Sequence, residues 1–110
     1  MKEKTLDNEE IIEKFAEESK NILKDNIIAE YLFGSYATHE QTPLSDIDIL
    51  IIVKEITLET RSQLGELSSD YSLKYDICIS PVLKDRSIWK KNQKYKTLFY
   101  SNILKYGIRL

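Results

Sequence analysis

The sequence contains few of the residues that mark secreted, membrane-spanning or disordered proteins. Its 110 residues include one cysteine, two prolines and three glycines. Cys78 alone cannot form an internal disulfide, and the scarcity of glycine and proline argues against a long disordered linker. The longest strongly apolar run, "ILIIV" at 49–53, is too short to cross a bilayer, and the charged N-terminus lacks the apolar core of a signal peptide. We therefore expect one cytoplasmic domain over residues 1–110, without a membrane partner.

Charge is distributed unevenly along the chain. Residues 1–83 hold 8 Lys/Arg against 17 Asp/Glu, whereas residues 84–110 hold 8 Lys/Arg and a single acid, Asp85. The basic region is either a solvated helix surface or a surface that attracts phosphate or an acidic partner. Because the whole chain has a net charge of −2, we do not expect a general nucleic-acid binder.

The hydrophobic pattern predicts an alternation of helices and strands. Helical spacing covers 8–24 and 58–73, and one or two helices occupy 87–106; strands are predicted at 27–33, 46–53 and 75–82, with a helical turn at 35–39. Asp7 or Asn8 and Thr57 are the expected N-caps, and Gly107 the expected glycine after the last helix. Pro81 places the third strand at an edge or an exit. The fold class is α/β or α+β, with a small mixed sheet and flanking helices.

Two acids open the second strand. Side chains alternate along a strand, so Asp46 and Asp48 point the same way, while Ile47, Ile49, Ile51 and Val53 point into the core. Two like charges this close raise each other's pKa, and a hard divalent cation such as Mg²⁺ relieves the repulsion. Asp76 lies on the predicted third strand; if that strand is next to the second, three carboxylates converge.

A Gly-Ser turn precedes these acids by ten residues. Gly34 lets a phosphate approach the backbone without a Cβ in the way, and Ser35 adds a hydroxyl donor at the start of a helical turn. One strand end can then hold metal while its neighbour holds the triphosphate that the metal bridges. This combination suits attack on a nucleotide phosphate at a two-metal site.

The segments "LFGSYA", "SDIDILIIV" and "YDICI", with the ending "LFYSNILKYGIRL", resemble the minimal nucleotidyltransferases of the DNA polymerase β-like superfamily. The resemblance covers nearly the whole chain and implies the polymerase β-like palm fold. It implies that Asp46 and Asp48 bind two Mg²⁺ ions, and that Asp76 binds the catalytic ion and helps to deprotonate the acceptor hydroxyl. It also implies that Gly34, Ser35 and Ser45 contact the nucleotide, with ATP as substrate and pyrophosphate leaving.

Minimal members of this family are commonly antitoxins that transfer AMP to a tyrosine of a HEPN ribonuclease toxin. The resemblance therefore implies a HEPN-domain partner, and a homo- or hetero-oligomer. Two alternatives remain open. One is a non-catalytic module that neutralises its partner by contact, and the other is transfer to a small molecule. Many members read Gly-Ser-x-Ala-Arg-Gly, whereas Thr38 and His39 stand here in place of Arg and the second Gly, a change that bears on activity or nucleotide preference.

Other residues are read as structural. His39 is expected in a loop, and Cys78 as a small buried hydrophobe. Asp70 is an alternative third acid, but it falls within a predicted helix. The C-terminal aromatics are expected in the core or at an interface, and stacking of a nucleotide base on one of them is the alternative; they are Trp89, Tyr95, Tyr100 and Tyr106.

Overall fold

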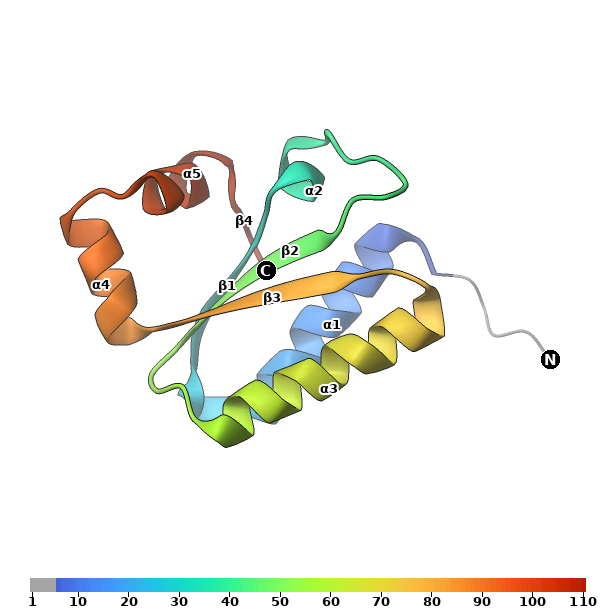
Figure 1. Ribbon diagram of the computed structural model, residues 1–110, viewed down its shortest axis with the longest axis horizontal. Helices are drawn as coiled ribbons and strands as arrows, with labels where there is room; N and C mark the ends of the chain where they lie inside the picture. Colours follow the sequence, from blue (N-terminus) through green and yellow to red (C-terminus); the bar gives the residue numbers. More distant parts are fainter. Residues whose placement is uncertain (1–5) are drawn as a thin grey trace.

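The computed structural model describes residues 6–110, which form one sheet with helices on both faces (Figure 1). The helices are α1 (Asn8–Leu23), α2 (Ser35–Thr38), α3 (Leu58–Tyr75), α4 (Arg86–Lys94) and α5 (Leu98–Tyr106), with a 3₁₀ turn η1 (Lys24–Asn26) after α1. The strands are β1 (Ile27–Phe33), β2 (Ile47–Val53), β3 (Ile79–Asp85) and β4 (Ile108–Arg109). Across this part of the chain, no helix combines the length and apolar character that a membrane crossing needs.

The sheet has the strand order β3-β2-β1-β4. β1 pairs antiparallel with both β2 and β4, whereas β2 and β3 run parallel. The mixed sheet with flanking helices confirms the predicted fold class. β4 was not predicted because its two residues are too few to show a period.

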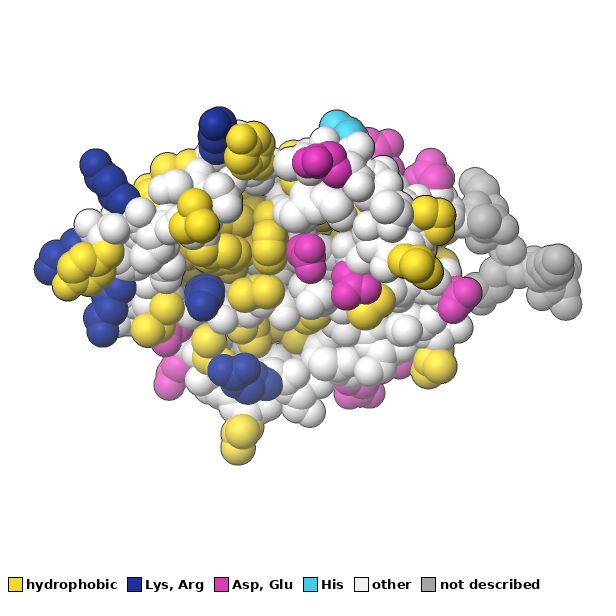
Figure 2. Space-filling view, turned by 45° about the horizontal axis from the view of Figure 1, so that its top comes forward, with side chains coloured by type: hydrophobic (Ala, Val, Ile, Leu, Met, Phe, Trp, Pro, Cys, Tyr) yellow, Lys and Arg dark blue, Asp and Glu magenta, His cyan; other side chains and the backbone are white. Residues whose placement is uncertain are grey.

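The two faces of the sheet bury different amounts of apolar surface. The face under α1 and α3 carries the main core, which includes Phe15, Ile47, Ile49, Ile51, Val53 and Leu64. On the opposite face, Leu50, Ile52 and Ile103 form a smaller buried cluster among residues 6–110. Figure 2, which looks onto α2, α4 and α5, shows hydrophobic side chains in the middle of this second face and Lys and Arg side chains gathered at the α4 end.

The third strand is present beside β2, but its predicted bounds of 75–82 were wrong. Helix α3 continues to Tyr75, and Asp76 ends it in the left-handed conformation (φ 53°, ψ 45°), so the strand begins only at Ile79. The reason is packing: Tyr71 is 4% exposed and its ring meets those of Phe15 and Tyr75, which keeps the segment helical. Pro81 lies in the middle of β3, which is an edge strand as predicted.

Most remaining boundaries agree with the sequence. β1 matches its predicted range, β2 begins one residue late, and 87–106 resolves into two helices. Asp7 and Thr57 cap α1 and α3 as expected, each accepting a hydrogen bond from a backbone N–H. Gly107 ends α5 with an extended backbone (φ −65°) rather than a left-handed one, and a Cβ there would collide with the carbonyl oxygen of Ile103.

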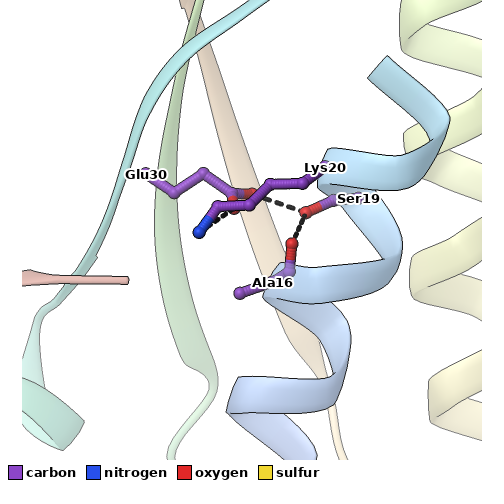
Figure 3. A network of polar contacts seen from close by, with 4 residues as sticks. All are labelled: Ala16, Ser19, Lys20 and Glu30. Carbon is purple, nitrogen blue, oxygen red and sulfur yellow. Dashed lines mark hydrogen bonds and ion pairs between the residues drawn. The ribbon is translucent and has the colours of Figure 1, made fainter. Parts of the chain in front are cut away.

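One charged side chain is buried beneath α1. The Glu30 side chain is fully buried; its Oε1 lies 2.5 Å from Ser19 Oγ, and its Oε2 lies 4.0 Å from Lys20 Nζ without a hydrogen-bond partner (Figure 3). Burial raises the pKa of Glu30, although Ser19 and Lys20 oppose the shift. Ser19 also donates to the Ala16 carbonyl at 2.9 Å. Since a hydroxyl has one hydrogen, Ser19 Oγ shares it between Glu30 Oε1 and the Ala16 carbonyl.

Candidate active site

Asp46 and Asp48 lie at the start of β2. Asp46 directly precedes the strand and is exposed, whereas Asp48 is half-buried within it. The N–H of Ile47 donates to the Cys78 carbonyl at 2.9 Å, which fixes this end of β2 against the segment that follows α3. Burial first, and then the charge of Asp46, raise the pKa of Asp48. The two carboxylates therefore interact, as their spacing predicts.

The Gly-Ser turn lies directly against Asp48. Phe33, the last residue of β1, pairs with Asp48 in the sheet. Gly34 has φ 72°, and a Cβ at this position would overlap the Asp48 carboxylate. Glycine is thus required both for the backbone conformation and for the approach of the turn to the acid. Ser35 follows as the first residue of α2.

Asp76 takes a different position from the one predicted. It is exposed at the end of α3, before β3 begins, and it lines a cavity of about 620 Å³ together with Asp46. Within the described residues, no three side chains of His, Cys, Asp and Glu come together as a metal site. The structure thus places Asp46 and Asp76 around one cavity, but it does not gather the three predicted carboxylates into one cluster.

Ser45 is held within its own loop. Its Oγ accepts a hydrogen bond from the Thr42 N–H at 2.8 Å, and its N–H donates to the Thr42 carbonyl at 3.0 Å. Ser45 lines the same cavity as Asp46, whereas Gly34 and Ser35 line a second cavity of about 370 Å³. The three residues predicted to contact nucleotide are therefore divided between two cavities, the first of which also includes Asp46.

Cys78 is a site residue that sequence reasoning missed. It was expected to be buried, but it is exposed and lies beside the carboxylates. Desolvation, the charge of Asp46, a hydrogen bond to Asp46 and the charge of Asp48 raise the pKa of this thiol. The parallel pairing of β2 and β3 places Cys78 opposite Asp46; that register could be read from the sequence only if the start of β3 were known.

The structure also shows where the other residues considered in the sequence analysis lie. Asp70 is exposed on α3 and outside both cavities, as its helical position indicated. His39 ends α2 with φ 61° and is exposed. Trp89 and Tyr100 pack with ring centroids 5.3 Å apart, while Tyr95 and Tyr106 are 69% and 48% exposed. The expectation of core or interface aromatics is thus confirmed for the first two as packed rings.

The donor set fits a hard divalent cation. Asp48 is half-buried beside a second carboxylate, and burial together with the charge of Asp46 raises its pKa. Carboxylate oxygens are the ligands that Mg²⁺ prefers, and sites with one or two carboxylates are completed by water and substrate phosphates. Asp46 and Asp48 would hold such an ion next to the Gly34 turn.

Comparison with known proteins agrees with this geometry. Residues 9–110 match the family described as "Polymerase beta, Nucleotidyltransferase". Two relatives from Methanocaldococcus jannaschii are named "Putative protein adenylyltransferase MJ0141" and "Putative protein adenylyltransferase MJ0604". The first is 40% identical over 102 residues, covering 92% of this chain and 96% of the relative. The second is 30% identical over 102 residues, covering 93% and 96%.

Solved structures share the fold. A crystal structure of a toxin-antitoxin with AMP-PNP superposes with a TM-score of 0.56 at 22% identity, over 93% of this chain and 71% of that one. A mutant of the toxin-antitoxin MntA-HpeT gives 0.54 at 19% identity, over 93% and 70%. A nucleotidyltransferase structure from Sulfolobus solfataricus gives 0.52 at 20% identity, over 91% and 76%.

The mixed sheet, with two acids at the start of one strand and a Gly-Ser turn at the end of its neighbour, is the fold of a nucleotidyltransferase. The chain belongs to the polymerase β-type nucleotidyltransferase family, as the sequence motifs indicated. It is an enzyme of the nucleotidyltransferase class.

Proposed function

We propose that the protein is an Mg²⁺-dependent protein adenylyltransferase that transfers AMP from ATP to a tyrosine of a HEPN ribonuclease toxin, and so acts as its antitoxin. The observation that carries this proposal is the contact of the Gly34 turn with Asp48, which puts the Gly-Ser turn directly beside the carboxylate that follows Asp46 on β2. The names of the M. jannaschii relatives support adenylyl transfer to protein. The toxin-antitoxin neighbours, one with AMP-PNP, support the kind of partner and nucleotide.

In the reaction that we propose, the two cavities hold the two sides of the transfer. The tyrosine oxygen attacks the α-phosphorus of ATP, the bond from that phosphorus to the bridging oxygen breaks, and pyrophosphate leaves. Attack is in line with the leaving group, so the acceptor enters from the side opposite the pyrophosphate. With the pyrophosphate held at Gly34 and Ser35, the acceptor side is the cavity of Asp46 and Asp76. Bound Mg²⁺ would supply charge stabilisation for the phosphates.

Asp76 is the group on that side that can take the acceptor proton. Its side chain is exposed and lies outside the sheet, at the end of α3, so its carboxylate can reach a hydroxyl that enters the cavity. A general base must come within about 2.6–3.2 Å of the proton that it removes, and this approach often tightens only when substrate is bound. Because the substrates are made and used inside the cell, we place this activity in the cytoplasm.

The test is label transfer from α-labelled ATP, with Mg²⁺ and a lysate of the source cell. Wild-type protein should label one protein band on tyrosine, and the Asp46→Asn, Asp48→Asn double variant should not. The matched control is Asp25→Asn, Asp70→Asn, which removes two exposed acids away from the cavities and should label like wild type. Label on RNA or a small molecule would overturn the antitoxin assignment while retaining the chemistry.

The second candidate is neutralisation by contact without transfer. It is favoured by the absence of a three-carboxylate cluster within residues 6–110, and by Thr38 and His39 in place of Arg and Gly. In that case the Asp46→Asn, Asp48→Asn variant would still bind and inhibit the partner, and no label would transfer from the wild-type protein.

A further inference from the structure

The second cavity joins the Gly-Ser turn to the C-terminal helix. Phe33, Gly34 and Ser35 form one wall, and Asn102 and Tyr106 of α5 form the other. Figure 1 shows α2 and α5 beside the same end of β1. The volume of about 370 Å³ lies within the range of about 300–1,000 Å³ that small-molecule sites occupy. The sequence analysis placed Gly34 and Ser35 at the nucleotide and left stacking of a base on Tyr106 open, but it did not bring these residues together in one cavity.

Helix α5 presents Asn102 and Tyr106 from a fixed position. The two residues are four apart, so they lie above one another on one helix face. The neighbouring face anchors the helix: Ile103 is 2% exposed, and the Phe99 ring lies 5.3 Å from that of Phe33. Both Asn102 and Tyr106 remain exposed, with Tyr106 at 48%. The backbone of Asn102 and Tyr106 is therefore held in place by α5, while their side chains are not buried in the core.

Their chemistry matches a nucleoside. An aromatic ring offers a face on which a base stacks, and the asparagine amide offers a donor and an acceptor that match the edge of adenine. Lys105 Nζ lies over the Tyr106 ring at 5.1 Å from its centroid, so a base would use the opposite face. Glu40, at the same cavity, has a carboxylate that can accept hydrogen bonds from ribose hydroxyls.

The cavity is also continuous with the site of transfer. Gly34 lies against Asp48 on one side and lines this cavity on the other. A triphosphate beside Asp48 at the turn thus leaves its nucleoside room toward α5. The larger cavity does not compete for that role, because in-line attack requires it for the acceptor.

We propose that the cavity between α2 and α5 holds the nucleoside of the triphosphate, with the base stacked on Tyr106 and its edge hydrogen-bonded to Asn102. This assignment rests on the proposed nucleotidyl transfer and deepens it: the two side chains would set the nucleotide preference that the sequence leaves open.

The test is a binding titration with α,β-methylene-ATP and Mg²⁺, because an adenylyltransferase cannot break the methylene bridge. Tyr106→Leu should weaken binding about tenfold or more, and Tyr106→Phe should retain most of it, since the ring remains. Asn102→Ala should reduce the preference for the adenine analogue over α,β-methylene-GTP. Inorganic tripolyphosphate, which lacks a nucleoside, should bind all variants like wild type.

Two control variants remove similar groups outside the cavity. Tyr95→Leu makes the same change at an exposed tyrosine after α4, and Asn21→Ala removes an exposed amide on α1. Both should bind the nucleotide analogue like wild type. Equal loss of analogue and tripolyphosphate binding in Tyr106→Leu would indicate a disturbed fold or phosphate site and would overturn the assignment.

The outcomes separate this assignment from the proposed function. If wild-type protein transfers AMP but the Tyr106 and Asn102 variants bind the analogue unchanged, the nucleoside site is wrong and the function stands. If the variants lose analogue binding but wild-type protein never transfers AMP, the site stands and the transfer is wrong. If wild-type protein does not bind the analogue, both are wrong.

Discussion

The two faces of the sheet differ in what their side chains do. The face under α1 and α3 is closed, with Ile47, Ile49, Ile51 and Val53 all fully buried between strand and helix. The face toward α4 and α5 is partly open: Tyr31, Phe33 and Val82 are only half-buried there, and Asp48 shares that face. One strand, β2, contributes to both. Because side chains alternate along β2, those that stabilise the fold lie on one face and the acid of the candidate site lies on the other. Substitutions on the two faces should therefore have separate effects on stability and on activity.

The largest expected effect on stability comes from the closed face. Ile51→Ala should lower the free energy of unfolding by about 3 kcal/mol, because it leaves a cavity in a fully packed core. Val82→Ala on the open face should cost about 1 kcal/mol, since its side chain is already half-exposed. Denaturant titration of the two variants measures both values. Equal losses would show that the two faces are packed alike.

The next prediction concerns the Gly34 turn between β1 and α2. Gly34→Ala should reduce AMP transfer by about a hundredfold, because its Cβ overlaps Asp48 and displaces the acid or the turn. It should also destabilise the fold by about 1–3 kcal/mol through its positive φ. Gly65→Ala is the matched control: a Cβ there meets nothing within 4 Å, so it should stabilise α3 by about 0.5–1 kcal/mol. Initial rates at equal folded fraction decide the first point.

The sequence predicted the closed face better than the open one. β1 and β2 could be located because their apolar residues are local signals, and Thr57 is a capping signal of the same kind. The start of β3 could not, because the hydrophobic pattern of Tyr75 to Ile79 fits a strand or the end of a helix equally well. Whether this segment forms a strand or the end of a helix depends on the contact of Tyr71 with Phe15, and these two residues lie far apart in sequence.

The candidate site was predicted in part for the same reason. The pairing of Gly34 with Asp48 follows from two neighbouring strands whose ranges were right. The positions of Asp76 and Cys78 follow from where β3 begins, which was wrong by four residues. The cavity wall at Asn102 and Tyr106 depends on how α5 docks, and no local pattern specifies a docking angle.

A smaller effect tests the one charge in the closed core. Because burial raises the pKa of Glu30 above its ordinary 4.5, the folded state binds more protons than the unfolded state between the ordinary pKa and the raised one. Stability therefore falls as pH rises through this window, by about 1.4 kcal/mol for each pH unit that separates the two pKa values. Glu30→Gln, which cannot ionise, should raise Tm by a few degrees near pH 7.

That increase should vanish below about pH 4.5, where Glu30 is protonated in both states. Thermal unfolding between pH 4 and pH 8 measures it, with Glu66→Gln on the exposed surface of α3 as the control. If Glu30→Gln lowered Tm near pH 7, the ion pair with Lys20 would outweigh the cost of burial, and the closed face would tolerate charge after all.

The smallest effect concerns Asp48, the charge on the open face. Burial and the charge of Asp46 raise the pKa of Asp48 above its ordinary 3.8, so its ionised form also destabilises the fold as pH rises through the raised pKa. Because Asp48 is half-exposed, the part of this effect that comes from repulsion by Asp46 is screened by salt, so the whole effect should be largest at low salt. Asp48→Asn should then have a slightly higher Tm than wild type near pH 7 without Mg²⁺, while Asp70→Asn should not.

Adding Mg²⁺ should reverse that order, because an ion that binds the folded state raises Tm by mass action. Wild-type Tm should rise with Mg²⁺, and Asp48→Asn should respond weakly because the half-buried carboxylate is gone. If Mg²⁺ raised the Tm of both proteins equally, the cation would bind elsewhere. The carboxylate pair at the start of β2 would then not be a cation site. If Mg²⁺ raised only the Tm of wild type, Asp48 would be a charge that destabilises the fold but binds the cation. Such a charge is useful only on the open face, because a cation and a phosphate can reach it there and not on the closed face.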